Sequence, residues 1–156
     1  MRVLILALAL GLAGCSGGSH LPTANSAAEI QYSNPLEIIQ KAADAAPKAV
    51  DGQYTLKIKA VGSSGSLVFL NTEQDYRDQR CVSIALHPEV VKQLTAKYGM
   101  SPEQYFTDKS VTVNGRAQRM KIDFISYGQP TGKYYYQTHI FVRELSQLEV
   151  ITSKVS

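Results

Sequence analysis

The chain has 156 residues, with 16 lysine and arginine residues against 13 aspartate and glutamate residues, so its formal net charge at pH 7 is +3. This small excess does not by itself indicate a nucleic acid binder, because such proteins usually have a strong basic patch. The patterned part of the chain, about 100 residues, suits one small domain and is too short for two hydrophobic cores.

The N-terminus has the pattern of a secretory signal peptide. A positive charge at Arg2 precedes an apolar run that is too short for a transmembrane helix, which needs roughly 20 residues. The run closes with Leu12-Ala13-Gly14-Cys15, which resembles the bacterial lipobox. That resemblance implies a signal peptide over residues 1–14 and attachment of lipid, including fatty acids such as palmitate, to Cys15. The alternatives are a plain secretory signal that happens to contain a cysteine and a buried N-terminal strand.

Lipid on Cys15 implies a bacterial lipoprotein held in an envelope membrane. Ser16 follows the cysteine, where aspartate would favour retention in the inner membrane of enteric bacteria. The resemblance therefore implies the outer membrane, at its periplasmic face, with the inner membrane as the alternative. If Cys15 is acylated, Cys81 has no partner for an intramolecular disulfide, and we expect a buried, inert thiol there.

Residues 15–33 are predicted to form a lipidated flexible tether, because they offer too little apolar surface to offset the entropy of ordering. A helix is predicted over residues 34–47, where asparagine, then proline, then glutamate form a typical helix start. Leu36, Ile39 and Ala43 would lie on the face of this helix that packs against the domain.

The hydrophobic period changes from 3.6 to 2 near residue 52, which indicates β-strands. Strands are predicted over residues 54–60, 66–71, 81–86, 109–115 with an extension at 120–124, 136–142 and 148–151. A helix is predicted over 88–98, followed by one helical turn ending near residue 106. Glycine-containing segments at 62–65 and 128–132 are predicted to be a turn and a loop.

Three strands, a helix and then two or three strands over residues 50–152 resemble the OB-fold. That fold is a five-stranded Greek-key barrel, here with the helix between strands three and four. The resemblance lies in topology and pattern, and a sandwich or another small barrel would give a similar strand list. The predicted fold class is therefore mainly β with helices, as an OB-fold-like domain preceded by an N-terminal helix.

The first candidate binding segment is the polar loop that begins at Asn71 and ends at Arg80. As a recognition loop, it would use the planar guanidinium groups of Arg77 and Arg80 for phosphate or carboxylate, and Tyr76 as a stacking face. The alternative is a solvated loop whose acids and arginines pair locally and fix its shape.

The second candidate is the tyrosine-rich segment near residue 135. In a strand, Tyr134 and Tyr136 would point to the same face. Beside Lys57, Lys59 and the arginines of the loop, these rings would form a stacking platform with cationic flanks, as in OB-folds that hold single strands or sugars. The alternative is that tyrosine suits a half-buried pleated surface.

No metal site, cofactor or catalytic group is predicted. His20, His87 and His139 are not spaced with other ligands as a metal site requires. The chain has no phosphate-binding glycine loop, nucleophile elbow or Cys–His pairing. Asp75 and Asp78 stand next to arginines that would keep them ionised, which does not suit a general acid. The protein is therefore predicted not to be an enzyme, and an OB-barrel hydrolase is the least favoured hypothesis.

The leading functional hypothesis is a membrane-anchored, non-catalytic module that binds or scaffolds an envelope protein or glycan. The alternative is a binder of single-stranded nucleic acid or oligosaccharide through the OB-fold face. That alternative requires the lysines, arginines and tyrosines named above to form one continuous surface.

Overall fold

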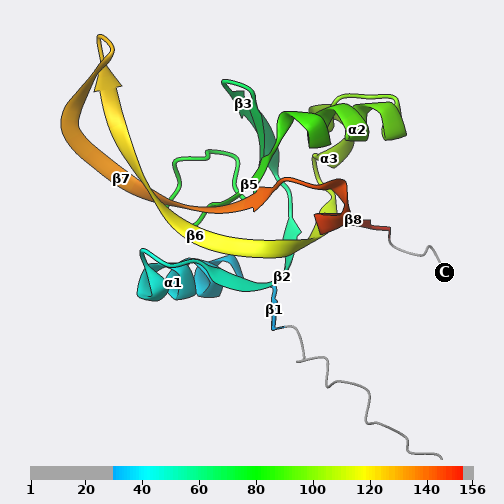
Figure 1. Cartoon of the computed structure of the whole chain (residues 1–156), viewed down its shortest axis with the longest axis horizontal. Coiled ribbons are helices and arrows are strands. Elements are labelled where there is room, and N and C mark those ends of the chain that lie inside the picture. The colour runs from blue at the N-terminus through cyan, green and yellow to red at the C-terminus, as the bar shows by residue number, and fades with distance from the viewer. Residues whose placement is uncertain (1–29, 153–156) are drawn as a thin grey trace, which may run out of the picture.

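The computed structural model describes residues 30–152. They form a mainly β structure with a few helices (Figure 1). The strands are β1 (Gln31–Tyr32), β2 (Val50–Lys57), β3 (Ala60–Ser64), β4 (Leu67–Asn71), β5 (Val82–Leu86), β6 (Ser110–Ser126), β7 (Gln129–Val142) and β8 (Leu148–Ile151). The helices are α1 (Pro35–Ala45), α2 (Pro88–Tyr98), α3 (Pro102–Phe106) and the 3-10 turn η1 (Leu145–Gln147).

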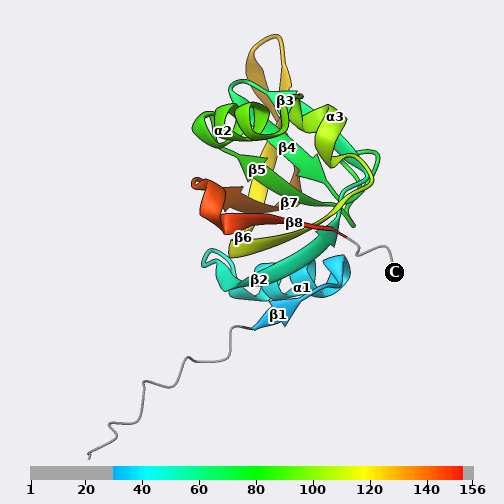
Figure 2. The ribbon, with the colours of Figure 1, turned by 90° about the vertical axis from the view of Figure 1, so that its right-hand side faces the viewer.

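The strands form one mixed sheet in the order β1-β2-β6-β7-β5-β4-β3, with β8 also paired to β6. The β1–β2 and β5–β7 pairs are parallel, and the other pairs are antiparallel. β2 and β3 lie far apart in this order, yet only Ile58 and Lys59 separate them in the chain. The sheet therefore curls until these two strands meet as halves of one bent segment (Figure 2).

The order of elements agrees with the prediction, because the bent β2–β3 segment, β4 and β5 precede α2, and β6 and β7 follow it. The expected count of five strands is too low for the described chain. The first predicted strand is divided into β2 and β3, while β1 and β8 add to the edges.

Alternation along β2 supplies one wall of the hydrophobic core. Tyr54, Leu56 and the following Ile58 are each no more than 1% exposed, as the period of 2 predicts. Phe106 from α3 is fully buried in the same core. Cys81, just before β5, is a buried free thiol as expected.

α1 lies within the predicted range 34–47 and begins as expected, because the Asn34 side chain accepts a hydrogen bond from the Leu36 backbone N–H at 3.0 Å. Its buried face was predicted only in part, because Ile39 is half-buried and packs against the core, while the most deeply buried positions are others. Ile38 and Ala42 are buried against the domain, whereas Leu36 is 57% exposed. The buried pair is spaced four apart and lies on one face, which turns toward β2 and β6 (Figure 1).

The tether predicted over residues 15–33 extends too far at its C-terminal end. Gln31 and Tyr32 form β1, and the Tyr32 ring stacks on Tyr54 with centroids 5.3 Å apart. Gly52 permits this contact, because a Cβ there would lie 2.8 Å from the Tyr32 ring. The predicted signal peptide, Cys15 and the tether up to residue 29 lie outside the described residues.

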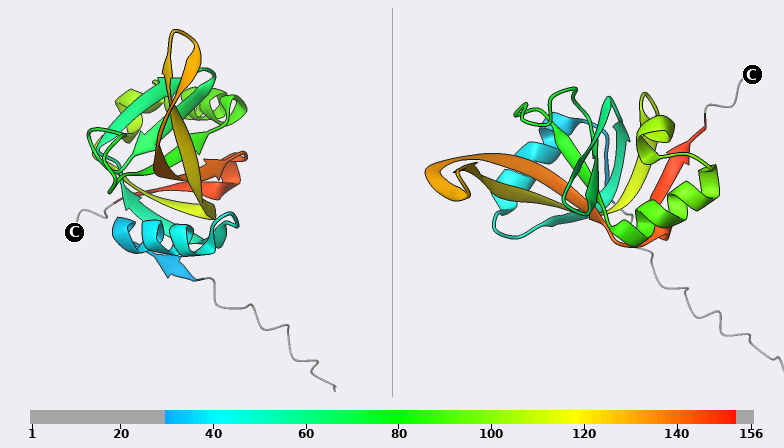
Figure 3. Two further views of the ribbon diagram at one scale, coloured as in Figure 1. Left: turned by 90° about the vertical axis from the view of Figure 1, so that its left-hand side faces the viewer. Right: turned by 90° about the horizontal axis from the view of Figure 1, so that it is seen from above.

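A long hairpin, β6–β7, extends away from the curled sheet (Figures 1 and 3). Its turn is formed by Tyr127 and Gly128, which both have positive φ angles, of 49° and 76°. This is the pattern of a tight type I′ turn. The prediction of a loop over 128–132 was wrong, because Pro130 and Gly132 lie inside β7. Beyond the body of the sheet β7 pairs only with β6 and has a free edge, where proline is tolerated.

Replacing Ser101 by alanine should lower the free energy of unfolding by about 1 kcal/mol. The Ser101 hydroxyl accepts a hydrogen bond from the Gln104 backbone N–H, and the Gln104 side chain accepts one from the Ser101 N–H. This capping box starts the short helix that delivers Phe106 to the core. Urea unfolding measures the change. Ser126→Ala, at an exposed end of β6, is the control, and an equal loss in both variants would contradict the capping role.

Candidate functional site

Two concave sites flank the β6–β7 hairpin, and we name them the groove and the cleft. The groove has a volume of about 400 Å³ and is lined by Gly62, Ser63, Ser64, Phe69, Asn71, Tyr76, Ser83, Ile122, Tyr135, Gln137 and His139. The cleft has a volume of about 520 Å³ and is lined by Ile39, Ala43, Gln79, Arg119, Tyr134, Tyr135, Tyr136, Gln137 and Thr138. Both volumes lie in the range of roughly 300–1,000 Å³ that is typical of ligand sites.

The groove floor is a row of polar side chains across three neighbouring strands. Asn71 of β4 pairs in register with Ser83 of β5, and Ser83 pairs with His139 of β7. All three are buried, and the Ser83 hydroxyl donates to Asn71 Oδ1 at 2.8 Å. The Phe69 ring lies beside His139, with centroids 5.5 Å apart. The floor therefore combines amide, hydroxyl and imidazole groups with an aromatic face.

Gln137 orients the polar groups along β7. Its Nε2 donates to the Tyr76 carbonyl and to the Tyr135 hydroxyl, both at 3.1 Å. Its Oε1 lies 2.7 Å from His139 Nε2, so the imidazole donates from Nε2 and keeps Nδ1 as an acceptor. Burial lowers the pKa of His139 to about 4, so this ring is neutral at pH 7. The groove lining therefore holds no charged side chain at neutral pH.

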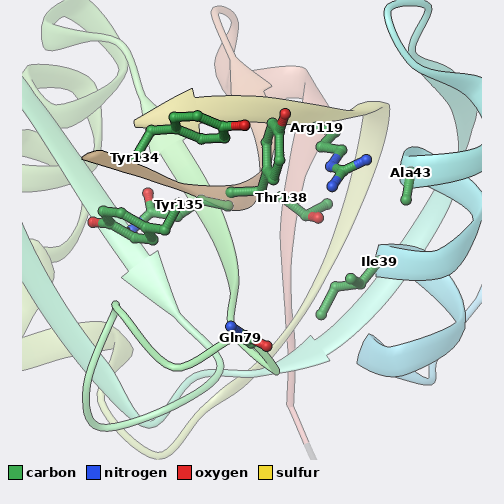
Figure 4. Close-up of a pocket in the computed structure, with 9 residues that line it drawn as sticks. Ile39, Ala43, Gln79, Arg119, Tyr134, Tyr135 and Thr138 are labelled. Atoms are coloured by element: carbon green, nitrogen blue, oxygen red, sulfur yellow. The ribbon is translucent and has the colours of Figure 1, made fainter. Parts of the chain in front are cut away.

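The cleft has a different character, because it contains a cation among aromatic rings. The Arg119 guanidinium carbon lies 3.6 Å from the Tyr136 ring centroid, and Lys121 Nζ lies 4.7 Å from the Tyr134 centroid. The Tyr134 and Tyr136 rings are 5.5 Å apart and meet edge to face. Figure 4 shows Ile39 and Ala43 of α1 facing Arg119 across the cleft.

The structure divides the predicted binding residues among three places. Asn71 and Tyr76 line the groove, whereas Tyr134 and Tyr136 line the cleft. The four predicted cations line neither site: they are Lys57, Lys59, Arg77 and Arg80. The predicted cations therefore lie outside the two concave sites, although the Arg77 guanidinium carbon is 5.8 Å from the centroid of the Tyr76 ring.

The polar loop after β4 is paired within itself. Arg77 contacts Asp75 at 2.9 Å and Arg80 contacts Asp78 at 2.7 Å, all largely on the surface. The hydrogen bonds from these arginines lower the pKa of Asp75, and they lower that of Asp78 to about 2. Both carboxylates are thus ionised at neutral pH, and the geometry matches the locally paired loop.

Lys59, which precedes β3, pairs with Glu73 of the polar loop. Lys59 Nζ lies 2.6 Å from Glu73 Oε2. Within residues 30–152, no group of three histidine, cysteine, aspartate or glutamate side chains could hold a metal ion. His87 instead accepts the Glu89 backbone N–H at the start of α2.

Sequence reasoning missed Arg119, Phe69, Ser83 and Gln137 as site residues. Phe69 and Ser83 belong to strand patterns, and their position opposite His139 follows only from the register of three strands. Arg119 falls between two predicted strand segments that are continuous in β6. Its pairing opposite Thr138 places it beside Tyr136. The sequence signal that could have placed Arg119 in the site is the alternation of side chains along one long strand, β6.

No protein-family model matches the chain, and no curated protein matches its sequence. Among solved structures, a putative aspartyl-tRNA synthetase from Leishmania major Friedlin matches with a TM-score of 0.44 and 11% sequence identity. The match covers 86% of this chain and 24% of the synthetase chain. The aspartyl-tRNA synthetase from Entamoeba histolytica matches with a TM-score of 0.43 and 13% sequence identity. The match covers 95% of this chain and 28% of the synthetase chain. The chain thus spans about a quarter of the length of each. Neither likeness assigns an activity to this protein.

Proposed function

We propose that this protein is an envelope lipoprotein whose OB-like domain binds an uncharged oligosaccharide segment in the groove. The observation that supports this most directly is the chemistry of the lining, which is aromatic and polar but holds no charged side chain at neutral pH. A sugar ring offers hydroxyl donors and acceptors at its rim and apolar C–H groups on its faces. The polar side chains of the lining can hydrogen-bond to the hydroxyl groups, and its aromatic rings can pack against the apolar faces.

The polar groups of the groove can serve as donors and as acceptors. The Asn71 amide nitrogen can donate, whereas Ser83 and Gln137, whose hydrogens are already used within the protein, keep acceptor capacity, and neutral His139 keeps one acceptor nitrogen. The rings of Tyr76 and Tyr135 supply faces for stacking. The position also suits the fold, because β4 and β5 occupy the second and third strands of the predicted barrel, which form the ligand face of OB-folds.

Single-stranded nucleic acid is the second candidate. It is favoured by Arg119 and Lys121, which lie over tyrosine rings as in cationic stacking platforms. Lys121, however, pairs with Asp123 at 2.9 Å, and the loop arginines pair with aspartates. A strand of phosphates needs several available cations, so the uncharged groove favours the oligosaccharide.

A protein partner is the third candidate. The tip of the hairpin exposes Phe124, Ile125 and Tyr127, and apolar groups that stand together on a surface are typical of contact sites. This tip lies outside both the groove and the cleft, so protein binding there would be compatible with a glycan in the groove.

Replacing Tyr76 by alanine should weaken binding of a neutral chitin tetrasaccharide about tenfold, because one stacking face of the groove is lost. Tyr76 is 52% exposed, so the change should leave the fold intact. Isothermal titration calorimetry measures the affinity. Wild-type affinity should change little between about 50 and 200 mM salt, because no phosphate is neutralised.

Tyr127→Ala is the matched control, since this tyrosine is fully exposed at the hairpin tip and outside the groove. It should bind the tetrasaccharide as the wild type does. The proposal would be overturned if oligothymidylate bound with a steep salt dependence while the neutral tetrasaccharide did not bind.

For location, we propose attachment through lipid on Cys15 to the periplasmic face of the outer membrane. The support is the lipobox-like sequence Leu12-Ala13-Gly14-Cys15 after a short apolar run. Within residues 30–152, none of the helices is long and apolar enough to cross a bilayer.

A further inference from the structure

The cleft contains an arginine whose charge has no partner in the described part of the chain. Arg77, Arg80 and Arg116 each contact an aspartate within 3.1 Å. Arg119 is half-buried, and no carboxylate of residues 30–152 lies within ion-pair distance of it. A half-buried guanidinium without a counter-ion loses hydration and gains no salt bridge in return, which favours an anionic ligand.

The surroundings of Arg119 hold its planar group in place. The Tyr136 ring covers one face of the guanidinium at 3.6 Å, which leaves the N–H groups at its rim available in the plane. Figure 4 shows the guanidinium projecting into the cleft between β6 and α1. Such a fixed fork matches the two oxygens of a carboxylate.

The other walls of the cleft suit a ring-shaped ligand body. The half-exposed Tyr134 offers an aromatic face, Ile39 of α1 is apolar, and Gln79 and Thr138 add polar atoms. The neighbouring Lys121 is neutralised by Asp123. The cleft thus presents one uncompensated positive charge beside stacking and hydrogen-bonding groups.

We propose that the cleft binds an acidic sugar unit, whose carboxylate pairs with Arg119 and whose ring packs on Tyr134. This deepens the proposed function and rests on it, because the cleft and the groove adjoin at Tyr135 and Gln137, which line both. The glycan is then one with both neutral and carboxylate-bearing units. A single unpaired cation matches one carboxylate and is too few for a run of phosphates.

The test compares a tetrasaccharide of alternating N-acetylglucosamine and glucuronate with its methyl ester. The free acid should bind the wild-type protein about tenfold more tightly than the ester, the value of one charge-assisted hydrogen-bonded contact. Arg119→Gln should abolish this preference and leave ester binding unchanged. Arg119→Lys, which keeps the charge and loses the planar fork, should retain part of it. Thermal unfolding of each variant confirms that the fold is intact.

Arg143→Gln is the matched control, because Arg143 is exposed and lines neither site. It should keep the full preference for the acid. Equal binding of acid and ester to the wild type, or equal losses in the Arg119→Gln and Arg143→Gln variants, would overturn the cleft proposal. So would an effect of Arg119→Gln on oligothymidylate binding alone, which would make the cleft a phosphate site.

The groove variant separates this proposal from the proposed function. If Tyr76→Ala weakens acid and ester equally while Arg119→Gln changes nothing, the groove function stands and the cleft proposal fails. If Arg119→Gln removes the acid preference while Tyr76→Ala has no effect, the cleft binds acidic sugars and the groove function fails. Failure of the wild type to bind the acid, its methyl ester and the neutral chitin tetrasaccharide would overturn both proposals.

Discussion

Replacing Cys15 by serine should transfer the protein from the membrane fraction of a bacterial host to the soluble periplasmic fraction. The proposed lipid is attached through the thiol, and acyl chains contribute ~0.8 kcal/mol per buried CH₂ group, so multiple chains give a firm anchor. No helix of residues 30–152 could substitute by spanning the bilayer. Fractionation and mass spectrometry of the N-terminus measure the outcome.

Cys81→Ser is the matched control, because Cys81 is the other cysteine of the chain and is buried in the domain. This variant should remain in the membrane fraction with its N-terminus acylated. A Cys15→Ser protein that stays membrane-bound and is processed normally would contradict the proposed anchor.

Acidification should destabilise the domain through His139. Its pKa is 6.5 in an unfolded chain and about 4 in the folded protein, where burial disfavours the charged ring. Between these two values the unfolded chain binds a proton that the folded protein does not. The free energy of unfolding therefore falls as the pH falls through this window, by up to about 3 kcal/mol at its lower end.

Urea unfolding near pH 7 and near pH 4.5 measures this loss. His139→Gln removes the titrating group, so its unfolding free energy should depend much less on pH over the same window. His87→Asn is the control, since asparagine can replace the histidine as the N-cap of α2. It should retain the pH dependence of the wild type. Equal pH dependence in the wild type and in His139→Gln would contradict the assignment.

Local signals predicted several elements accurately. The helix predicted over 88–98 is α2, which starts at Pro88 and is capped by Gly99 with a φ of 69°. The helical turn predicted to end near residue 106 is α3, which begins with the capping box of Ser101 and Gln104. Alternation located the buried side chains of β2. These features depend on residues close together in the chain, so the sequence alone is sufficient.

Features that depend on distant pairing were not predictable in the same way. Pro130 and Gly132 are typical loop residues, yet both lie in β7, where Pro130 pairs with Ile125 and Gly132 falls at the register shift that follows this pair. The face of α1 that is buried depends on where the sheet lies, not on the helix pattern. Arg119 and Tyr136 meet only because β6 and β7 pair in a fixed register between Ala117 and Asp123.

The charged loop shows the same limit for the candidate site. Asp75, Arg77, Asp78 and Arg80 are near neighbours in the chain, and their local pairing was one of the two interpretations that the sequence allowed. The choice between pairing and ligand binding required the geometry. Asn71 and Tyr76, from the same stretch, do line the groove.

The length of β6 has a structural consequence. This single strand pairs with β2 and β8 near its start and then continues to the hairpin tip. Its 17 residues extend over roughly 55 Å at about 3.4 Å per residue. β2 also holds β1, the first described strand. The hairpin tip is therefore connected, through the continuous backbone of β6, to the edge of the sheet at which the described residues begin.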